Sequence, residues 1–407
     1  MGIHTLKGTM RNSRASLLLG LAIAMVAFNL RTIAVAVGPV LPLIRADLGM
    51  SDTVAGLLTS LPTLCFAVFG LLGPGLAQRI GVQHAILVAL VANVAGQAAR
   101  VLSAGTVSFM AATIAALAGI GVINVLLPPL VKRHFPTRNG LVTALYVTAQ
   151  SVGLTLASLC TAPLGIKLTG WRNAFWVWAI TMAAALPLLI WATVRFSERT
   201  ANGRRRAITL RQVAGTRLGW MMAVFFGMQS AQAYGQFGWL PSIYQDAGFS
   251  AVAAGTYLGI VAAVGVPLSF VIPSLTTRLR NPVWLVFAMT GSGLLGYLGL
   301  IVDPRTLPWL WPCLLAVAGS CFPMILVLLG MRTRTPAGTA ALSSFAQSAG
   351  YVLASFGPFL FGAVKDATGN YLGPLWIQFG LFLPLLVCAV AAIRSRALED
   401  ELGISAG

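Results

Sequence analysis

Charged side chains are scarce in this sequence, and acidic ones are the scarcest. Only 9% of the 407 residues are charged, nine of them Asp or Glu, and 57% are hydrophobic. Soluble domains carry about 25% charged residues. The hydrophobic residues form runs along the whole chain, and many runs reach the roughly 20 residues that a transmembrane helix needs. The composition excludes a soluble globular protein and predicts an all-α polytopic membrane protein.

The side chains that carry enzyme chemistry or bind metals are also few. The three histidines lie in the N-terminal tail, at the start of an apolar run and in a loop: His4, His84 and His134. None of the five cysteines has the Cys-x-x-Cys spacing of metal ligands. No nucleophile–base pair, metal-ligand set or pair of carboxylates is apparent. We therefore expect no enzyme activity, no cofactor and no metal site.

Twelve apolar segments are long enough to span a bilayer. They cover residues 15–44, 53–77, 84–103, 107–131, 138–164, 171–194, 217–242, 250–275, 282–302, 307–330, 337–364 and 371–394. We expect an N-terminal six-helix bundle (1–194), a basic cytoplasmic interdomain loop (195–216) and a C-terminal six-helix bundle (217–407). That loop is too short for a signalling domain, which disfavours a receptor or sensor.

The formal net charge of +18 would indicate nucleic-acid binding in a soluble protein. In a membrane protein, cytoplasmic loops rich in Lys and Arg explain it. With these twelve spans, 20 of the 27 basic residues lie on the side of both termini, and six, Arg100 among them, lie on the other side. We therefore expect both termini in the cytoplasm and no nucleic-acid partner. The remaining basic residue is Arg31, inside the first span.

The two halves of the chain are similar to each other. Residues 41–51 read LPLIRADLGMS and residues 240–250 read LPSIYQDAGFS, so that Leu, Pro, Ile, Asp, Gly and Ser coincide. Residues 144–158 and 341–355 match at nearly the same offset. Such a repeat indicates that six spans were duplicated in parallel orientation. In this arrangement the chain resembles the major facilitator superfamily, whose two halves enclose a site at the membrane midplane and rock to give alternating access.

Within that superfamily, the sequence resembles the bacterial cyanate and 2-nitroimidazole transporter family. Four stretches carry the resemblance: 29–31 with 38–39, 124–128 with 135–136, 239–241 with 245–248, and 346–351 with 366–369. The resemblance implies a secondary transporter of a small solute in the bacterial inner (cytoplasmic) membrane. Folds of this kind need no second copy to form their site, so we expect a monomer.

Arg31 is the first candidate for substrate contact. An arginine at the centre of a transmembrane helix costs about 2.5–3.5 kcal/mol on insertion scales, and no Asp, Glu or His lies inside the expected spans to pair with it. Its planar fork of donors suits an anionic or strongly electronegative ligand. The alternative is a structural arginine that is held by backbone carbonyls and amides, or that reaches the outer interface.

Polar residues of other spans complete the predicted substrate site. Together with Arg31 they are Asn29, Asn124, Tyr146, Gln150, Gln229, Gln232, Gln236, Gln347 and Tyr351. The resemblance implies that spans 1, 4, 5, 7, 10 and 11 line the cavity, and every one of these residues lies on such a span. The alternative for each amide is a helix–helix hydrogen bond without a ligand. Asn29, two residues from Arg31, points to a different helix face, which favours an orienting contact.

The expected substrate is a small anionic or electronegative solute, cyanate-like or a small organic anion. The alternative is export of nitroimidazole-type or other drug-like compounds. A buried carboxylate would favour cationic drugs, and its absence from the expected spans disfavours them. Proton coupling would then be indirect, for example by transport of the substrate as its acid.

Overall fold

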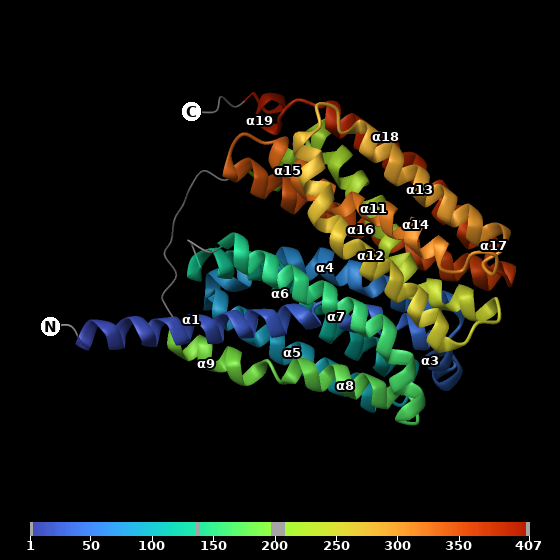
Figure 1. Cartoon of the computed structure of the whole chain (residues 1–407), viewed down its shortest axis with the longest axis horizontal. Coiled ribbons are helices and arrows are strands. Elements are labelled where there is room, and N and C mark those ends of the chain that lie inside the picture. The colour runs from blue at the N-terminus through green and yellow to red at the C-terminus, as the bar shows by residue number, and fades with distance from the viewer. Residues whose placement is uncertain (1–2, 136–138, 197–207, 404–407) are drawn as a thin grey trace.

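The computed structural model describes residues 3–135, 139–196 and 208–403, and these residues form helices without any β-strand. The first helices form an N-terminal group: α1 (Ile3–Asn29), α2 (Thr32–Val35), η1 (Gly38–Val40), α3 (Leu41–Leu48), α4 (Asp52–Ile80), α5 (Val82–Leu102), α6 (Thr106–His134), α7 (Asn139–Lys167), α8 (Trp171–Ala183) and α9 (Leu186–Phe196). Figure 1 shows this group, in blue to green, beside a second group in yellow to red.

The second, C-terminal group begins after the polar stretch. It contains α10 (Leu210–Ala214), α11 (Arg217–Asp246), α12 (Ala251–Arg278), α13 (Val283–Val302), α14 (Leu310–Gly319), α15 (Cys321–Met331), α16 (Pro336–Thr368), α17 (Leu372–Gly380), α18 (Phe382–Arg394) and α19 (Leu398–Glu401). The short helix α10 falls within the expected interdomain loop, where Thr209 caps its first turn. Residues 197–207 of that loop lie outside the described residues.

Ten helical segments of the described chain are long and apolar enough to cross a membrane, so the protein is a multi-span membrane protein. The expected spans 7 and 11 correspond to α11 and α16, which have 30 and 33 residues but fall outside those ten. Both carry glutamines, serines and glycines along their length. Both lie at the centre of the bundle, where α16 packs against α11 and α4.

Three expected spans are interrupted shortly before a proline. Spans 6, 10 and 12 break at Ala184–Ala185, Ser320 and Leu381, and a proline follows within three residues of each break, at 187, 323 and 384. A proline ring clashes with the carbonyl one turn earlier and donates no hydrogen bond there, so the helix is interrupted one turn before it. The sequence contains the prolines that cause these breaks, but the length of an apolar run alone does not reveal the breaks.

The two groups meet at the end of the molecule that is distant from both termini, here called the closed end. The Gly56 Cα position of α4 is so near the backbone of α16 that a Cβ there would lie 2.9 Å from the Phe359 carbonyl oxygen. A Cβ on Gly255 of α12 would lie 2.8 Å from the Ser158 carbonyl oxygen of α7. Glycines permit such close helix contacts. Toward the termini, the ribbons of the two groups diverge (Figure 1).

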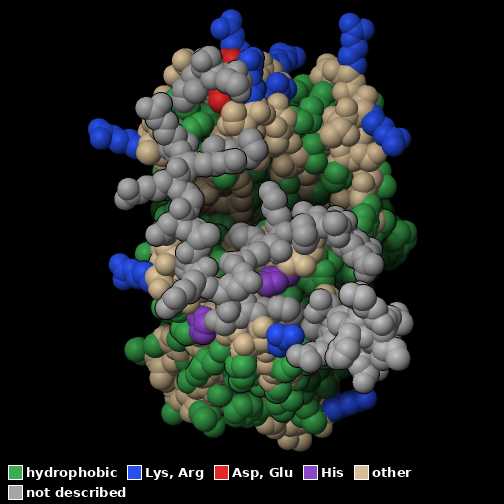
Figure 2. Space-filling view, turned by 90° about the vertical axis from the view of Figure 1, so that its left-hand side faces the viewer, with side chains coloured by type: hydrophobic (Ala, Val, Ile, Leu, Met, Phe, Trp, Pro, Cys, Tyr) green, Lys and Arg blue, Asp and Glu red, His purple; other side chains and the backbone are tan. Residues whose placement is uncertain are grey.

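The end that carries both termini has a basic rim. Figure 2 looks onto this end and shows Lys and Arg side chains around its edge. The described, exposed members are Arg79, Arg195, Arg211, Arg217, Arg278, Arg280, Arg334, Arg394 and Arg396. The charge count also places other basic residues at this end, but their side chains lie outside the described residues. They are Lys7, Arg11, Arg14, Lys132, Arg133, Arg138, Arg199 and Arg204–Arg206.

Candidate functional site

Arg31 lies where the first span stops being helical. α1 ends at Asn29, and Arg31 is the residue before α2, with φ −113° and ψ −15°. The Leu30 amide donates to the Ala27 carbonyl at 3.1 Å, and the Val35 amide donates to the Arg31 carbonyl at 3.1 Å. Because of this break, the half-buried Arg31 guanidinium lies near the middle of the span and not at a helix end on the surface.

The partners of Arg31 come from the C-terminal group. Its Nη1 donates to the Tyr234 hydroxyl of α11 at 3.4 Å, and its Cζ lies 5.7 Å from the ring centroid of Phe322 in α15. Among the described residues, no carboxylate contacts Arg31. Because a guanidinium has five N–H donors, most of its hydrogen-bonding capacity remains available to a ligand or water.

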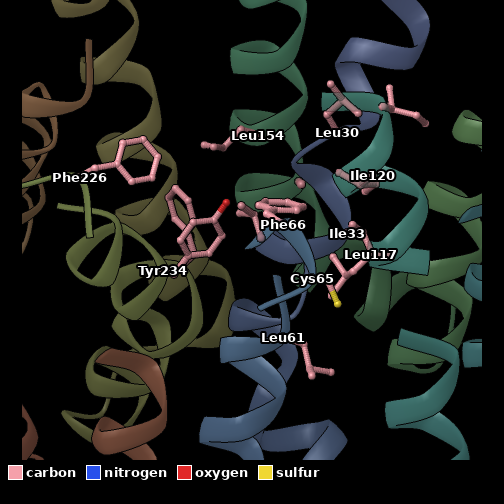
Figure 3. Close-up of a cluster of buried hydrophobic side chains, with 14 of the residues drawn as sticks. Leu30, Ile33, Leu61, Cys65, Phe66, Leu117, Ile120, Leu154, Phe226 and Tyr234 are labelled. Atoms are coloured by element: carbon pink, nitrogen blue, oxygen red, sulfur yellow. The ribbon is translucent and has the colours of Figure 1, made fainter. Parts of the chain in front are cut away.

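Five rings linked by ring–ring contacts form what we call the aromatic cluster, and two of them, Tyr234 and Phe322, contact Arg31. The cluster comprises Phe66, Phe226, Tyr234, Phe322 and Tyr351. Phe66 of α4 lies 6.2 Å from Tyr234 and 5.5 Å from Tyr351, measured between centroids. Phe226 of α11 lies 4.9 Å from Tyr351 and 6.0 Å from Phe322. Figure 3 shows Tyr234 between Phe226 and Phe66, with its hydroxyl directed toward Phe66.

The sequence analysis named only Tyr351 of this cluster. The other four rings lie in apolar runs, where a phenylalanine or tyrosine looks like any lipid-facing or core residue. Phe66, Phe226 and Tyr234 are buried, whereas Phe322 and Tyr351 are partly exposed. The spacing along α11 gave no signal, because Tyr234 lies between glutamines that point elsewhere.

Those glutamines bond within the C-terminal group. Gln232 Nε2 donates to the Gln378 carbonyl of α17 at 2.6 Å, and Gln236 Nε2 donates to the Tyr297 hydroxyl of α13 at 3.3 Å. Gln229 Nε2 lies 3.4 Å from the Gly319 carbonyl at the end of α14. In the described structure they make helix–helix contacts, which is the alternative use of buried amides in membranes, and their contact with substrate stays a prediction.

Asn29 also faces its own bundle. It is 2% exposed, and its Oδ1 accepts a hydrogen bond of 2.7 Å from the Thr181 hydroxyl of α8. Its Nδ2 donates to the Met25 carbonyl at 3.0 Å. Asn29 thus ties α1 to α8 immediately before Arg31, as an orienting contact would, and its contact with substrate stays a prediction.

The remaining predicted residues lie half-buried on three helices. Asn124 is on α6, Tyr146 and Gln150 are on α7, and Gln347 is on α16, where its Nε2 donates to the Ser343 hydroxyl at 2.7 Å. Half-burial near the middle of a helix is compatible with lining a cavity between the two groups. Their contact with substrate stays a prediction.

Arg100, which the charge count placed on the side away from the termini, is buried inside the N-terminal group. It lies in the last turn of α5 and is 3% exposed. Its Cζ lies 4.3 Å from the Phe175 centroid and 5.0 Å from the Phe109 centroid, and its Nη1 lies 3.4 Å from the Ile33 carbonyl. Its Nε and Nη2 have no hydrogen-bond partner among the described residues. Arg31 is therefore not the sole arginine inside the bundle.

A small cavity lies between Tyr234 and the closed end. Its walls come from four helices and the first-span break: Ile33, Ala34, Val37, Leu58, Thr59, Pro62, Thr113, Leu117, Tyr234, Phe237 and Gly238. Its free volume for a water-sized sphere is about 10 Å³, which corresponds to roughly one water molecule. This cavity is therefore too small to hold a solute larger than water. The described residues contain no group of three or more His, Cys, Asp or Glu that could hold a metal.

Comparison with known proteins gives a consistent assignment. Residues 17–358 match the model of the Major Facilitator Superfamily. The chain is 31% identical to the 2-nitroimidazole transporter of Escherichia coli, over 93% of this chain and 95% of that protein. It is 28% identical to the cyanate transport protein CynX of Escherichia coli, over 86% of this chain and 91% of that protein. The fold is similar to the inward open conformation of the xylose transporter XylE, with a TM-score of 0.73, 14% identity, and 95% and 99% of the two chains covered.

Proposed function

Because the chain belongs to the Major Facilitator Superfamily, we propose that this transporter moves a small anionic or electronegative solute by alternating access and binds it at Arg31. The observation that carries the proposal is a half-buried guanidinium that faces the opposite group and contacts no carboxylate of the described residues. A cation in such a place is stabilised by a ligand that brings an acceptor or a negative charge. The contacts of Arg31 span both groups, so they change when the groups move.

In this proposal the moving bodies are the two six-helix bundles, 1–194 and 217–407, joined by the loop 195–216. The basic rim supports cytoplasmic termini in a bacterial inner membrane. The site would then be open to the cytoplasm and closed to the outside in the described structure. The site forms within one chain, which supports a monomer.

Charged residues join the two bundles at the closed end, and we call them the closing contacts. Lys365 of α16 donates to Asp52 of α4 at 3.1 Å, and Asp52 also pairs with Arg45. The Thr53 hydroxyl donates to Asp366 at 2.6 Å. This hydrogen bond holds the pKa of Asp366 below its ordinary value. Because the ionised carboxylate is the stronger acceptor, the contact is at full strength at neutral pH and weakens as the pH falls through the lowered pKa.

Alternating access requires the closing contacts to break. We expect Lys365→Gln to shift the population toward the outward-open state. Ala104 and Thr306 lie in closed-end loops of the two bundles, and spin labels at these positions would report the shift as a longer distance between them. The matched control is Asp47→Asn, which removes an ion pair to Arg172 inside one bundle. An unchanged distance in Lys365→Gln, or an equal change in both variants, would contradict the proposal that the closing contacts hold the closed end shut.

The binding site is tested by ligand-induced shifts of the melting temperature, since a ligand that binds only the folded state stabilises it. Purified wild type and Arg31→Gln are compared with cyanate, nitrate, acetate and 2-nitroimidazole. We expect an anion to stabilise the wild type and not the variant. If only neutral heterocycles stabilise, and both proteins respond alike, Arg31 is structural.

The second candidate function is export of nitroimidazole-type compounds. The aromatic cluster favours it, because five linked rings beside one guanidinium provide surface for a heteroaromatic solute. In that case 2-nitroimidazole stabilises the wild type in the same assay and the small anions do not.

A further inference from the structure

The aromatic cluster next to Arg31 offers mostly carbon and few hydrogen-bonding groups. Besides the guanidinium, the cluster contributes only the hydroxyls of Tyr234 and Tyr351, and Phe66, Phe226 and Phe322 contribute rings alone. A bare anion such as nitrate or cyanate gives up several hydration contacts when it enters such a site. Burying polar surface without replacing these hydrogen bonds is unfavourable. A solute with one acceptor group and an apolar body matches this surface better.

The rings also have a specific geometry. Phe66 and Phe226 meet Tyr351 edge to face, with interplanar angles of 69° and 90°. Edge-to-face and offset contacts between rings at 4.5–7 Å are favourable beyond the area they bury, on the order of a few-fold to about tenfold in affinity. An added planar ring can extend this arrangement. A puckered aliphatic ring has no π-system with which to do so.

Two rings of the cluster are partly exposed and pack against a buried third ring. Phe226 is fully buried and packs against both Phe322 and Tyr351, which are themselves partly exposed. Arg31 lies over the Phe322 ring. A planar solute that covers the exposed parts of these two rings therefore brings a group on its edge to the guanidinium.

We infer that the site selects solutes in which a planar aromatic ring carries one anionic or electronegative acceptor group, such as an arenecarboxylate or a nitro-substituted heteroarene. The ring covers Phe322 and Tyr351, and the acceptor group receives hydrogen bonds from Arg31. This inference rests on the proposed function and names the substrate class of the same site. It ranks bare inorganic anions and aliphatic acids below aromatic ones.

The test compares ligands that differ in one property each. Benzoate and cyclohexanecarboxylate share a charge and a six-membered ring, but only benzoate is planar and aromatic. Acetate and nitrate lack a ring, and 2-nitroimidazole carries a ring and a neutral acceptor. Apparent Kd values come from melting-temperature shifts over a concentration series. We expect benzoate or 2-nitroimidazole to bind wild type at least roughly fivefold more tightly than cyclohexanecarboxylate, acetate or nitrate.

The aromatic contact itself is tested with Phe322→Leu, which keeps apolar volume and removes the ring. We expect the preference for the aromatic ligand to fall about 2- to 10-fold. The matched control is Phe345→Leu on α16, whose ring packs on Trp220 outside the cluster. If Phe322→Leu does not fold, Tyr351→Leu replaces it, and Tyr351→Phe must then retain the preference.

The outcomes separate the inference from the proposed function. Equal binding of benzoate and cyclohexanecarboxylate, or an unchanged preference in Phe322→Leu, overturns the inference. If nitrate or acetate binds as tightly as benzoate and Arg31→Gln removes that binding, the inference fails while the proposed function stands. If Arg31→Gln binds every ligand as wild type does, both fail. If 2-nitroimidazole binds and benzoate does not, the result supports selection of aromatic rings and identifies nitro-substituted heteroarenes as the substrate class.

Discussion

Arg31 and Arg100 are two arginines of the same bundle with opposite surroundings. Neither contacts a carboxylate in the described part of the chain. Arg31 is half-buried, and its partners, Tyr234 and Phe322, belong to the other bundle. Arg100 is 3% exposed, and its partners, Ile33, Phe109 and Phe175, belong to its own. Burial of a cation is therefore not by itself a sign of function; what matters is whether its partners move relative to it.

The two arginines also act on the same broken span. Arg100 donates to the carbonyl of Ile33, two residues after Arg31. A backbone carbonyl at a helix break lacks its helical donor, and leaving it unpaired in the membrane is unfavourable. Arg100 thus holds the first span in place, and the span presents Arg31 to the interface between bundles. Arg100 supports the segment that carries Arg31, and Arg31 is the residue that we propose binds the solute.

The largest expected effect is the loss of stability in Arg100→Ala. The substitution removes a fully buried side chain, its two ring contacts and the hydrogen bond to Ile33. A cavity of this kind destabilises by about 2–5 kcal/mol, so the melting temperature without ligand falls by several degrees. Arg31→Ala is the control and leaves it nearly unchanged. Equal melting temperatures for the two variants would remove the distinction between the arginines.

A smaller effect is expected from Arg31→Lys, which keeps the charge but removes the planar fork of donors. We expect binding of the favoured ligand to weaken about tenfold, because one ammonium cannot reproduce a bidentate contact. Titration by melting-temperature shift measures it, with Arg100→Lys as the partner variant. If Arg100→Lys weakens binding as much as Arg31→Lys does, Arg100 is part of the site.

The smallest effect is expected where Asn29 ties α1 to α8. Thr181→Val removes the donor to Asn29 Oδ1 and keeps the side-chain shape. Hydrogen bonds between transmembrane helices average about 0.6 kcal/mol, so the melting temperature falls by only a degree or two, while ligand affinity stays within a factor of about two. A loss of affinity as large as that of Arg31→Lys would place Asn29 in the substrate site.

Much of the fold could be predicted from the sequence because membranes impose long apolar runs, and the charge asymmetry and the repeat mark the order of the spans. Arg31 was visible because an arginine in the middle of such a run is costly. Arg100 was not, since it lies near the end of its run, and its partners Phe109 and Phe175 come from other helices. Sequence position alone does not distinguish a loop arginine from one that folds inward.

The site was predicted less completely for a similar reason. The spacing of Gln229, Gln232 and Gln236 identified one helix face correctly but could not say which neighbours that face meets. It meets α13, α14 and α17 of its own bundle. Tyr234, which contacts Arg31, lies between these glutamines and looks like a core residue. Which face of α11 points to the interface depends on the packing of the whole bundle.

The most direct test of the central claim is solute uptake into proteoliposomes that contain wild type, Arg31→Gln or Arg100→Lys. The solute is the radiolabelled form of whichever ligand gives the largest melting-temperature shift. We predict saturable uptake by wild type and Arg100→Lys, and uptake by Arg31→Gln no greater than that of empty liposomes. Equal saturable uptake by wild type and Arg31→Gln would contradict the account, because the solute would then cross without the guanidinium.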